Sequence, residues 1–111
     1  MTALLKLATL TLTEAEPVTI AGGVATITQS VVILTSETST ADDLDSLVFD
    51  SNVYLGDYLP FVILLAASGH TITVKHGVTD IILNAAGDFS LTDAKALLLW
   101  TDGTNWHDLG A

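Results

Sequence analysis

In most segments of this chain an apolar residue occupies every second position, and this period of two is the feature that most limits the fold. Residues 71–75, TITVK, place Ile72 and Val74 on one face of an extended strand and Lys75 on the other, with the two threonines. β-Branched residues are abundant, and glycine or aspartate clusters recur about every 8–12 residues. The pattern predicts an all-β domain, a compact β-sandwich or partly open barrel.

Several segments fit strands by this criterion. They are residues 3–12, 18–20, 24–34, 47–49, 60–67, 71–75, 80–84, 88–91, 96–101 and 104–109. Only residues 41–47 and 90–97 suit a helical turn, and in the first of these Thr40 is placed to cap the turn together with Asp43. We divide the chain into an extended N-terminal arm, residues 1–17, and a β-domain, residues 18–111.

The final hairpin is the most specific local prediction. Asp102-Gly103 lies between two apolar-rich arms, and this dipeptide is typical of a type I′ turn, whose two central residues both need a positive φ. Such a turn pairs Thr101 with Thr104. One face of the hairpin then carries Leu97, Leu99 and Trp106, and the other carries Leu98, Trp100 and His107. If the first face is the core, we expect Trp100 to be covered by a second subunit, at a trimer interface.

The net charge limits the choice of partner. Thirteen Asp or Glu residues against three Lys and no Arg give a formal charge of −10. Capture of phosphate needs clustered cations, so we expect binding neither to nucleic acid nor to an anionic membrane surface. The longest apolar run, residues 61–67, is much shorter than the ~20 residues of a membrane-spanning helix. There is no cysteine, which excludes disulfides and thiolate chemistry.

The histidines do not predict a metal site. His70 and His76 are six residues apart along one strand, roughly 20 Å at about 3.3 Å per residue, which is too far for two ligands of one ion even with His107 as a third. We therefore expect each to end a strand beside a turn.

No other group of residues predicts catalysis or a cofactor. Asp42, Asp43 and Asp45 lack the glycine and the distal glutamate of an EF-hand, so a solvated acidic turn is expected. Gly22-Gly23 lacks the spacing of a phosphate-binding loop and predicts an ordinary turn. We expect a protein that is not an enzyme and that holds neither a metal nor a cofactor.

Read in order, six short motifs resemble a β-domain found in structural proteins of tailed bacteriophages. The motifs are Ile27-Thr28, Asp42 to Asp45, Thr71 to Gly77, Ile81 to Leu83, Asp88 to Leu91 and Asp102 to Trp106, which together cover about residues 25–109. The chain departs from the family pattern at Asp80, where Asn is commoner, and at Trp100, where a smaller residue is usual.

The resemblance implies a place in a virion, where such domains are usually trimers. A chain that runs from Met1 to two residues past Leu109 leads us to expect a stand-alone capsid decoration (cement) protein. Such a protein is a homotrimer on the outer face of the phage head that binds the major capsid protein and stabilises contacts between its subunits. The alternative is a receptor-binding or carbohydrate-binding module of a tail fibre or spike.

The N-terminal arm carries the predicted capsid contacts. Its leucines are spaced by two with one slip of phase near Ala8-Thr9, as in a strand with a bulge. They are Leu5, Leu7, Leu10 and Leu12. So apolar a strand promotes aggregation unless a partner covers it. We expect the arm to add as a strand to a sheet of the capsid subunit; the alternative is that it completes the domain's own sheet.

Overall fold

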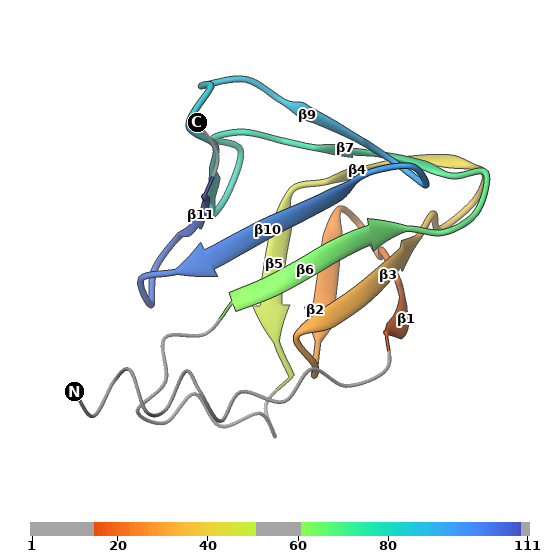
Figure 1. Ribbon diagram of the computed structural model, residues 1–111, viewed down its shortest axis with the longest axis horizontal. Coiled ribbons are helices and arrows are strands. Elements are labelled where there is room, and N and C mark those ends of the chain that lie inside the picture. The colour runs from red at the N-terminus through yellow and green to blue at the C-terminus, as the bar shows by residue number, and fades with distance from the viewer. Residues whose placement is uncertain (1–14, 51–60, 110–111) are drawn as a thin grey trace.

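The fold is built from strands alone. A computed structural model describes residues 15–50 and 61–109, and within these ranges it contains eleven strands and no helix (Figure 1). The all-β prediction is therefore confirmed. The predicted strand at 3–12, with Leu5, Leu7, Leu10 and Leu12, lies outside the described residues.

The strands form three sheets, which we call A, B and C. Sheet A has the order β1 (Glu16–Thr19), β3 (Val31–Thr35), β6 (Phe61–Ala66), β10 (Ala96–Thr101), β11 (Trp106–Asp108) and β8 (Ile81–Ile82). Sheet B pairs β2 (Val24–Ile27) with β5 (Ser46–Phe49). Sheet C has the order β4 (Ala41–Leu44), β7 (Thr71–Val74) and β9 (Phe89–Thr92). β1 begins at Glu16, so the boundary that we placed after residue 17 falls inside this strand.

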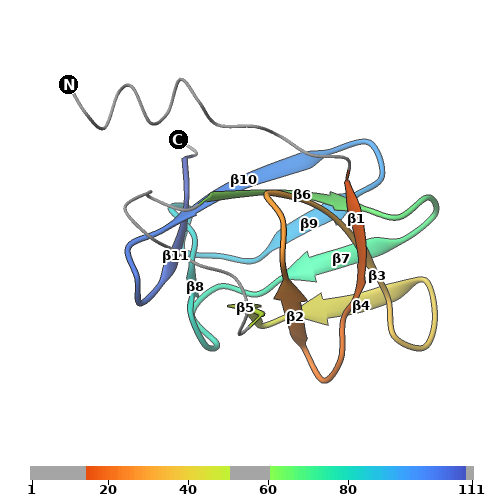
Figure 2. The same cartoon turned by 90° about the horizontal axis from the view of Figure 1, so that it is seen from below.

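The chain winds twice around the three sheets in the same order. β2, β3 and β4 make the first turn through B, A and C, and β5, β6 and β7 make the second. Each strand of the second turn pairs in parallel with its counterpart in the first. The chain then reverses, so β9 runs antiparallel to β7 and β10 antiparallel to β6. Figure 2 shows the resulting walls around a common interior.

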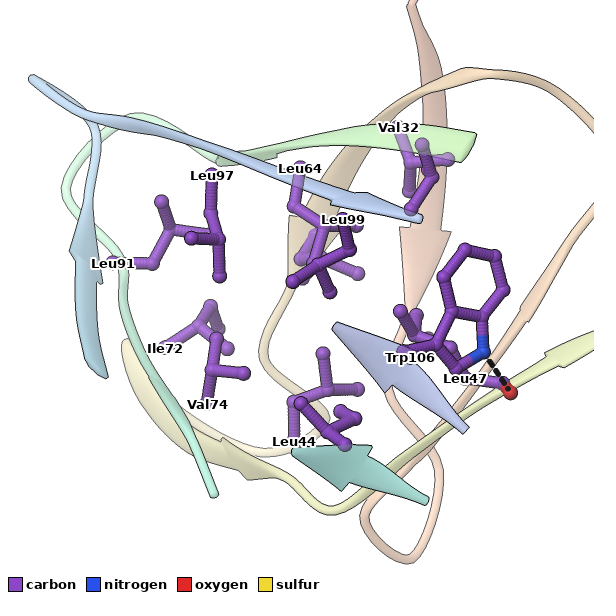
Figure 3. Packing of buried hydrophobic residues seen from close by; sticks show 14 of the residues in the cluster. Val32, Leu44, Leu47, Leu64, Ile72, Val74, Leu91, Leu97, Leu99 and Trp106 are labelled. Carbon is purple, nitrogen blue, oxygen red and sulfur yellow. Dashed lines mark hydrogen bonds between the residues drawn. The ribbon is translucent and has the colours of Figure 1, made fainter. Parts of the chain in front are cut away.

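One hydrophobic core fills the space between the sheets, and all three supply it (Figure 3). Fully buried side chains alternate along the strands, as in β6 and β7, because successive side chains of a strand point to opposite faces. The alternation that predicts Ile72 and Val74 as core residues is confirmed, since neither is exposed to solvent. Trp106 closes the core beside Phe49, with ring centroids 5.4 Å apart.

Two predicted segments are wrong in detail. The single strand expected at 24–34 divides into β2 in sheet B and β3 in sheet A, because the chain bends at residues 28–30 to change sheets. The helical turn expected at 41–47 is instead β4 followed by β5. Thr40 caps no helix; its carbonyl accepts the backbone N–H of Thr71, in line with the parallel pairing of β4 and β7. The segment 90–97 likewise contains β9, a turn and the start of β10.

The final hairpin has the predicted faces but another register. Thr101 pairs with Trp106, not with Thr104, so four residues rather than two form the loop. A type I′ turn would need a positive φ at Asp102 as well as at Gly103, and only Gly103 has one. The carboxylate of Asp102 instead accepts the backbone N–H groups of Thr104 and Asn105. Because the register shifts by two, each side chain keeps its predicted face.

Candidate functional site: the outer face of sheet A

The outer face of sheet A, turned away from the core, is mostly apolar. The strand register places most of its side chains in three rows across the strands, and Thr19 and Thr35 form a polar border at one end. The rows are Pro17, Ile33, Leu65 and Ala96; Val31, Ile63 and Leu98; and Phe61, Trp100, His107 and Ile82. Most of these side chains are half-buried, whereas Pro17 and Ala96 are exposed. We call these eleven residues the outer face of sheet A.

Trp100 is the largest side chain on this face, and it lies on the side that the alternation predicts. The residues before and after it in β10, Leu99 and Thr101, are buried. Its indole stacks on the imidazole of His107, with centroids 4.7 Å apart and the planes 30° apart. Nothing in these contacts tests a role of Trp100 at a trimer interface, which stays a prediction.

Asp102 fixes the corner of the hairpin beside Trp100. Its Oδ2 lies 3.0 Å from Nε2 of His107, and its Oδ1 accepts two backbone N–H groups of the loop. The backbone N–H of Asn105, then His107 and the backbone N–H of Thr104, lower the pKa of Asp102 to about 2. The carboxylate therefore stays charged at the border of an apolar face.

Three of the end strands, β1, β4 and β9, carry features that oppose the addition of another strand. Pro17 in β1 has no backbone N–H to donate. Asp42 and Asp43 place carboxylates on β4, and Lys95 lies over the Phe89 ring of β9, with Nζ 5.5 Å from the ring centroid. Charges and prolines at sheet edges discourage pairing between chains. We therefore expect a partner protein to bind the outer face of sheet A rather than to add a strand at these edges.

The structure does not bring the three histidines together. His70 directly precedes β7 and His76 follows it, so they lie at opposite ends of that strand, and His107 lies in β11 of another sheet. Within residues 15–50 and 61–109, no group of three His, Cys, Asp or Glu side chains is arranged to hold a metal ion.

The acidic cluster does not form the solvated turn that we predicted. Asp42 and Asp43 belong to β4, and Asp42 accepts the backbone N–H groups of Glu37 and Asp43. The prediction failed because both aspartates lie in a strand, β4, which pairs with β7. Gly22 and Gly23, by contrast, do form a turn, with φ of 59° and 81° between the bridged residues Ala21 and Val24.

Lys75 and Asp80, two polar residues named in the sequence analysis, each form contacts that hold the fold. Lys75 forms an ion pair with Asp88, with Nζ 3.0 Å from Oδ2, and hydrogen bonding to Asp88 raises the pKa of the lysine. Asp80 Oδ2 accepts the hydroxyl of Ser46, and the Asp80 carbonyl accepts the backbone N–H of Trp106. In the described part of the chain, Asp80 Oδ1 is the one buried side-chain polar atom without a hydrogen-bond partner.

Sequence reasoning missed most of the outer face of sheet A, although a signal was present. The strands β3, β6 and β10 read VVILT, FVILLA and ALLLWT. In each of them apolar residues occupy the outward-facing positions as well as the inward-facing ones. Continuous apolar strands are typical of sheets that are covered on both sides. The described residues of this chain cover the inner side of sheet A with the core.

Comparison of the chain with protein-family models, with curated proteins and with solved structures found no match. None of the described residues forms a helix long and apolar enough to cross a lipid bilayer.

Proposed function

We propose that this chain is a structural protein of a tailed-bacteriophage virion, which binds as a homotrimer to the outer surface of the head and stabilises contacts between major capsid subunits. The observation that carries the proposal is the apolar outer face of sheet A. An apolar surface of this extent, centred on Val31, Ile63 and Leu98, favours burial against another protein surface. The resemblance of residues 25–109 to phage structural domains supplies the kind of partner.

The chemistry of the chain supports an assembly role rather than a catalytic one. Two titratable side chains, His107 on the outer face and Asp102 at its border, are paired with each other. Lys75 is paired with Asp88 at the other side of the fold. These contacts give all four side chains a structural role.

The charge of the chain favours a partner with basic groups around an apolar centre. With a formal charge of −10, copies of the chain repel one another, whereas a cationic surface attracts each of them. Added salt screens both effects. Self-association through the apolar face is therefore expected to strengthen with ionic strength, and binding to a basic capsid surface is expected to weaken.

The test is binding to heads. Heads of the phage that encodes the chain, assembled without it, would be incubated with the purified protein and sedimented. We expect saturable co-sedimentation and a higher temperature of head disruption, and we expect both to be lost in the Ile63→Glu variant. Val78→Glu is the matched control, because Val78 is a 56% exposed residue outside the outer face. Failure of the folded wild-type protein to bind would refute the decoration role.

A module of a tail fibre or spike, binding a receptor or a carbohydrate, is the second candidate. The parallel stacking of two turns of chain, β2 to β4 under β5 to β7, favours it, because stacked turns are the principle by which elongated β-solenoids are built. Antibody labelling of virions decides between the candidates, since a decoration protein is labelled over the head and a fibre module at the tail.

A further inference from the structure

Two histidines hold the ends of β7 through the same ring atom. At its start, Nδ1 of His70 accepts the backbone N–H of Ser36 at 3.2 Å and lies 3.0 Å from the Ser36 hydroxyl oxygen. Beyond its end, Nδ1 of His76 accepts the backbone N–H of Leu83 at 2.9 Å. An imidazole nitrogen accepts a hydrogen bond only when it carries no proton, so both contacts require the neutral ring with its proton on Nε2.

These contacts join successive turns of the chain. Ser36 follows β3 in the first turn, and His70 precedes β7 in the second, so the first contact links two neighbouring corners. His76 and Leu83 flank the loop that leads from β7 through β8 to the reversed part of the chain. β7 is the central strand of sheet C, with β4 on one side and β9 on the other.

We propose that His70 and His76 make sheet C sensitive to pH: protonation of either ring at Nδ1 sets an N–H against a backbone N–H and releases one end of β7. The exchange removes the acceptor of a part-buried backbone donor. At His70 the new N–H can turn to the hydroxyl oxygen of Ser36, but the backbone N–H of Ser36 still loses its acceptor. The proposal concerns the stability of sheet C and is independent of the proposed function. Acidification is the trigger, because a neutral imidazole accepts at Nδ1 and a protonated one cannot.

The charges around His76 nearly cancel. Asp88 accepts the backbone N–H of His76 with Oδ1, and its Oδ2 pairs with Lys75. The carboxylate attracts a protonated ring, and the ammonium group repels it. In the solvent-exposed setting of this pair, neither effect replaces the lost acceptor.

The groups around His70 are carboxylates that already serve backbone donors. Asp93 accepts the N–H of Gly69, Glu37 accepts the N–H of Gly22, and Asp42 accepts the N–H of Glu37. Each therefore holds a corner of the chain, and none of these contacts supplies a new acceptor for Ser36 when the ring takes up a proton.

His107 provides an internal control. Its Nε2 lies 3.0 Å from a carboxylate oxygen of Asp102, which accepts hydrogen bonds, so this contact does not require a ring nitrogen without a proton. Acidification therefore leaves this contact in sheet A intact while it breaks those of His70 and His76. The predicted effect of acid is a loss of order in sheet C that spares the outer face of sheet A.

The test replaces His70 and His76 with asparagine. The Oδ1 of asparagine is bonded to Cγ, as Nδ1 of histidine is, and it accepts a hydrogen bond at any pH. We expect the urea midpoint of the wild-type protein to fall between about pH 8 and about pH 5, and the drop to shrink by at least half in the H70N/H76N variant. The H107N variant, as control, keeps the full drop. A drop of equal size in the wild-type and H70N/H76N proteins would overturn the proposal.

A second measurement needs no variant. Nitrogen NMR of the imidazole rings should find Nδ1 of His70 and His76 without a proton at neutral pH. On acidification, amide exchange corrected for its intrinsic pH dependence should accelerate at Ile72 and Leu91 of sheet C before Leu64 and Leu99 of sheet A. A proton on Nδ1 at neutral pH, or simultaneous acceleration in both sheets, would contradict the proposal.

Discussion

The indole Nε1–H of Trp106 donates a hydrogen bond of 3.1 Å to the carbonyl oxygen of Leu47, which joins β11 to β5 across 59 positions of the chain (Figure 3). Both residues are buried, and this contact ties sheet A to sheet B at the end of the core. In the unfolded chain water pairs with both groups. A buried carbonyl that loses its donor in the folded protein has no water to replace it, which costs stability.

Trp106→Phe should therefore lower the free energy of unfolding by roughly 2 kcal/mol or more, because it strands the Leu47 carbonyl and leaves a cavity. Urea denaturation monitored by circular dichroism measures the loss. The matched control is Trp100→Phe on the outer face of sheet A, which should change stability by less than about 0.5 kcal/mol. Equal losses in the two variants would contradict the assignment of inner and outer faces.

Gly22 and Gly23, which form the tight turn before β2, should respond differently to substitution by alanine. Both have a positive φ, so each substitution costs about 1–2 kcal/mol in backbone strain. A Cβ at Gly22 meets nothing within 4 Å, whereas a Cβ at Gly23 lies 2.5 Å from Oδ2 of Asp45. Thermal denaturation should show the larger loss for Gly23→Ala, and Asp45→Ala in the same chain should narrow the gap. Equal losses for both alanines would remove the close approach as a cause.

The charged carboxylate of Asp102 should contribute its full stabilisation of the fold only above the pKa that it has in the unfolded chain. Its pKa falls from 3.8 to about 2 on folding, so the contribution is complete above about pH 4 and is lost as the pH falls through about 2. Asp102→Asn keeps an acceptor for the loop but does not titrate. The urea midpoint should thus fall less between these pH values in the variant than in the wild-type protein. An unchanged pH dependence would show that the carboxylate contributes nothing.

The alternation of apolar residues was sufficient to predict the class of fold and the core positions of several strands. It placed Ile72 and Val74 inside and Trp100 outside, because the side-chain period of a strand does not depend on its partners. The faces of the last hairpin survived a register error, since the error was two residues. A shift of one would have inverted them.

The arrangement of strands could not be predicted in the same way. β3 pairs with β6 in parallel although Val31 and Ile63 lie far apart in the sequence, and nothing local distinguishes such a pairing from an antiparallel one. The hydrogen bonds of His70 and His76 could not be predicted either. Their backbone partners, Ser36 and Leu83, come near the rings only through the stacking of successive turns of the chain. Sequence spacing could say only that the two rings do not share a metal.

The most direct test of the central claim, that the outer face of sheet A is an assembly surface, is sedimentation equilibrium of the wild-type protein beside Ile63→Glu and Val78→Glu. Ile63 lies between Val31 and Leu98 in the middle row, so a carboxylate there costs desolvation only if the face is buried by another subunit. We predict a mass three times that of the chain for the wild-type protein and Val78→Glu, and a folded monomer for Ile63→Glu. A monomeric wild-type protein at high micromolar concentration, or a trimer that Ile63→Glu leaves intact, would contradict the account.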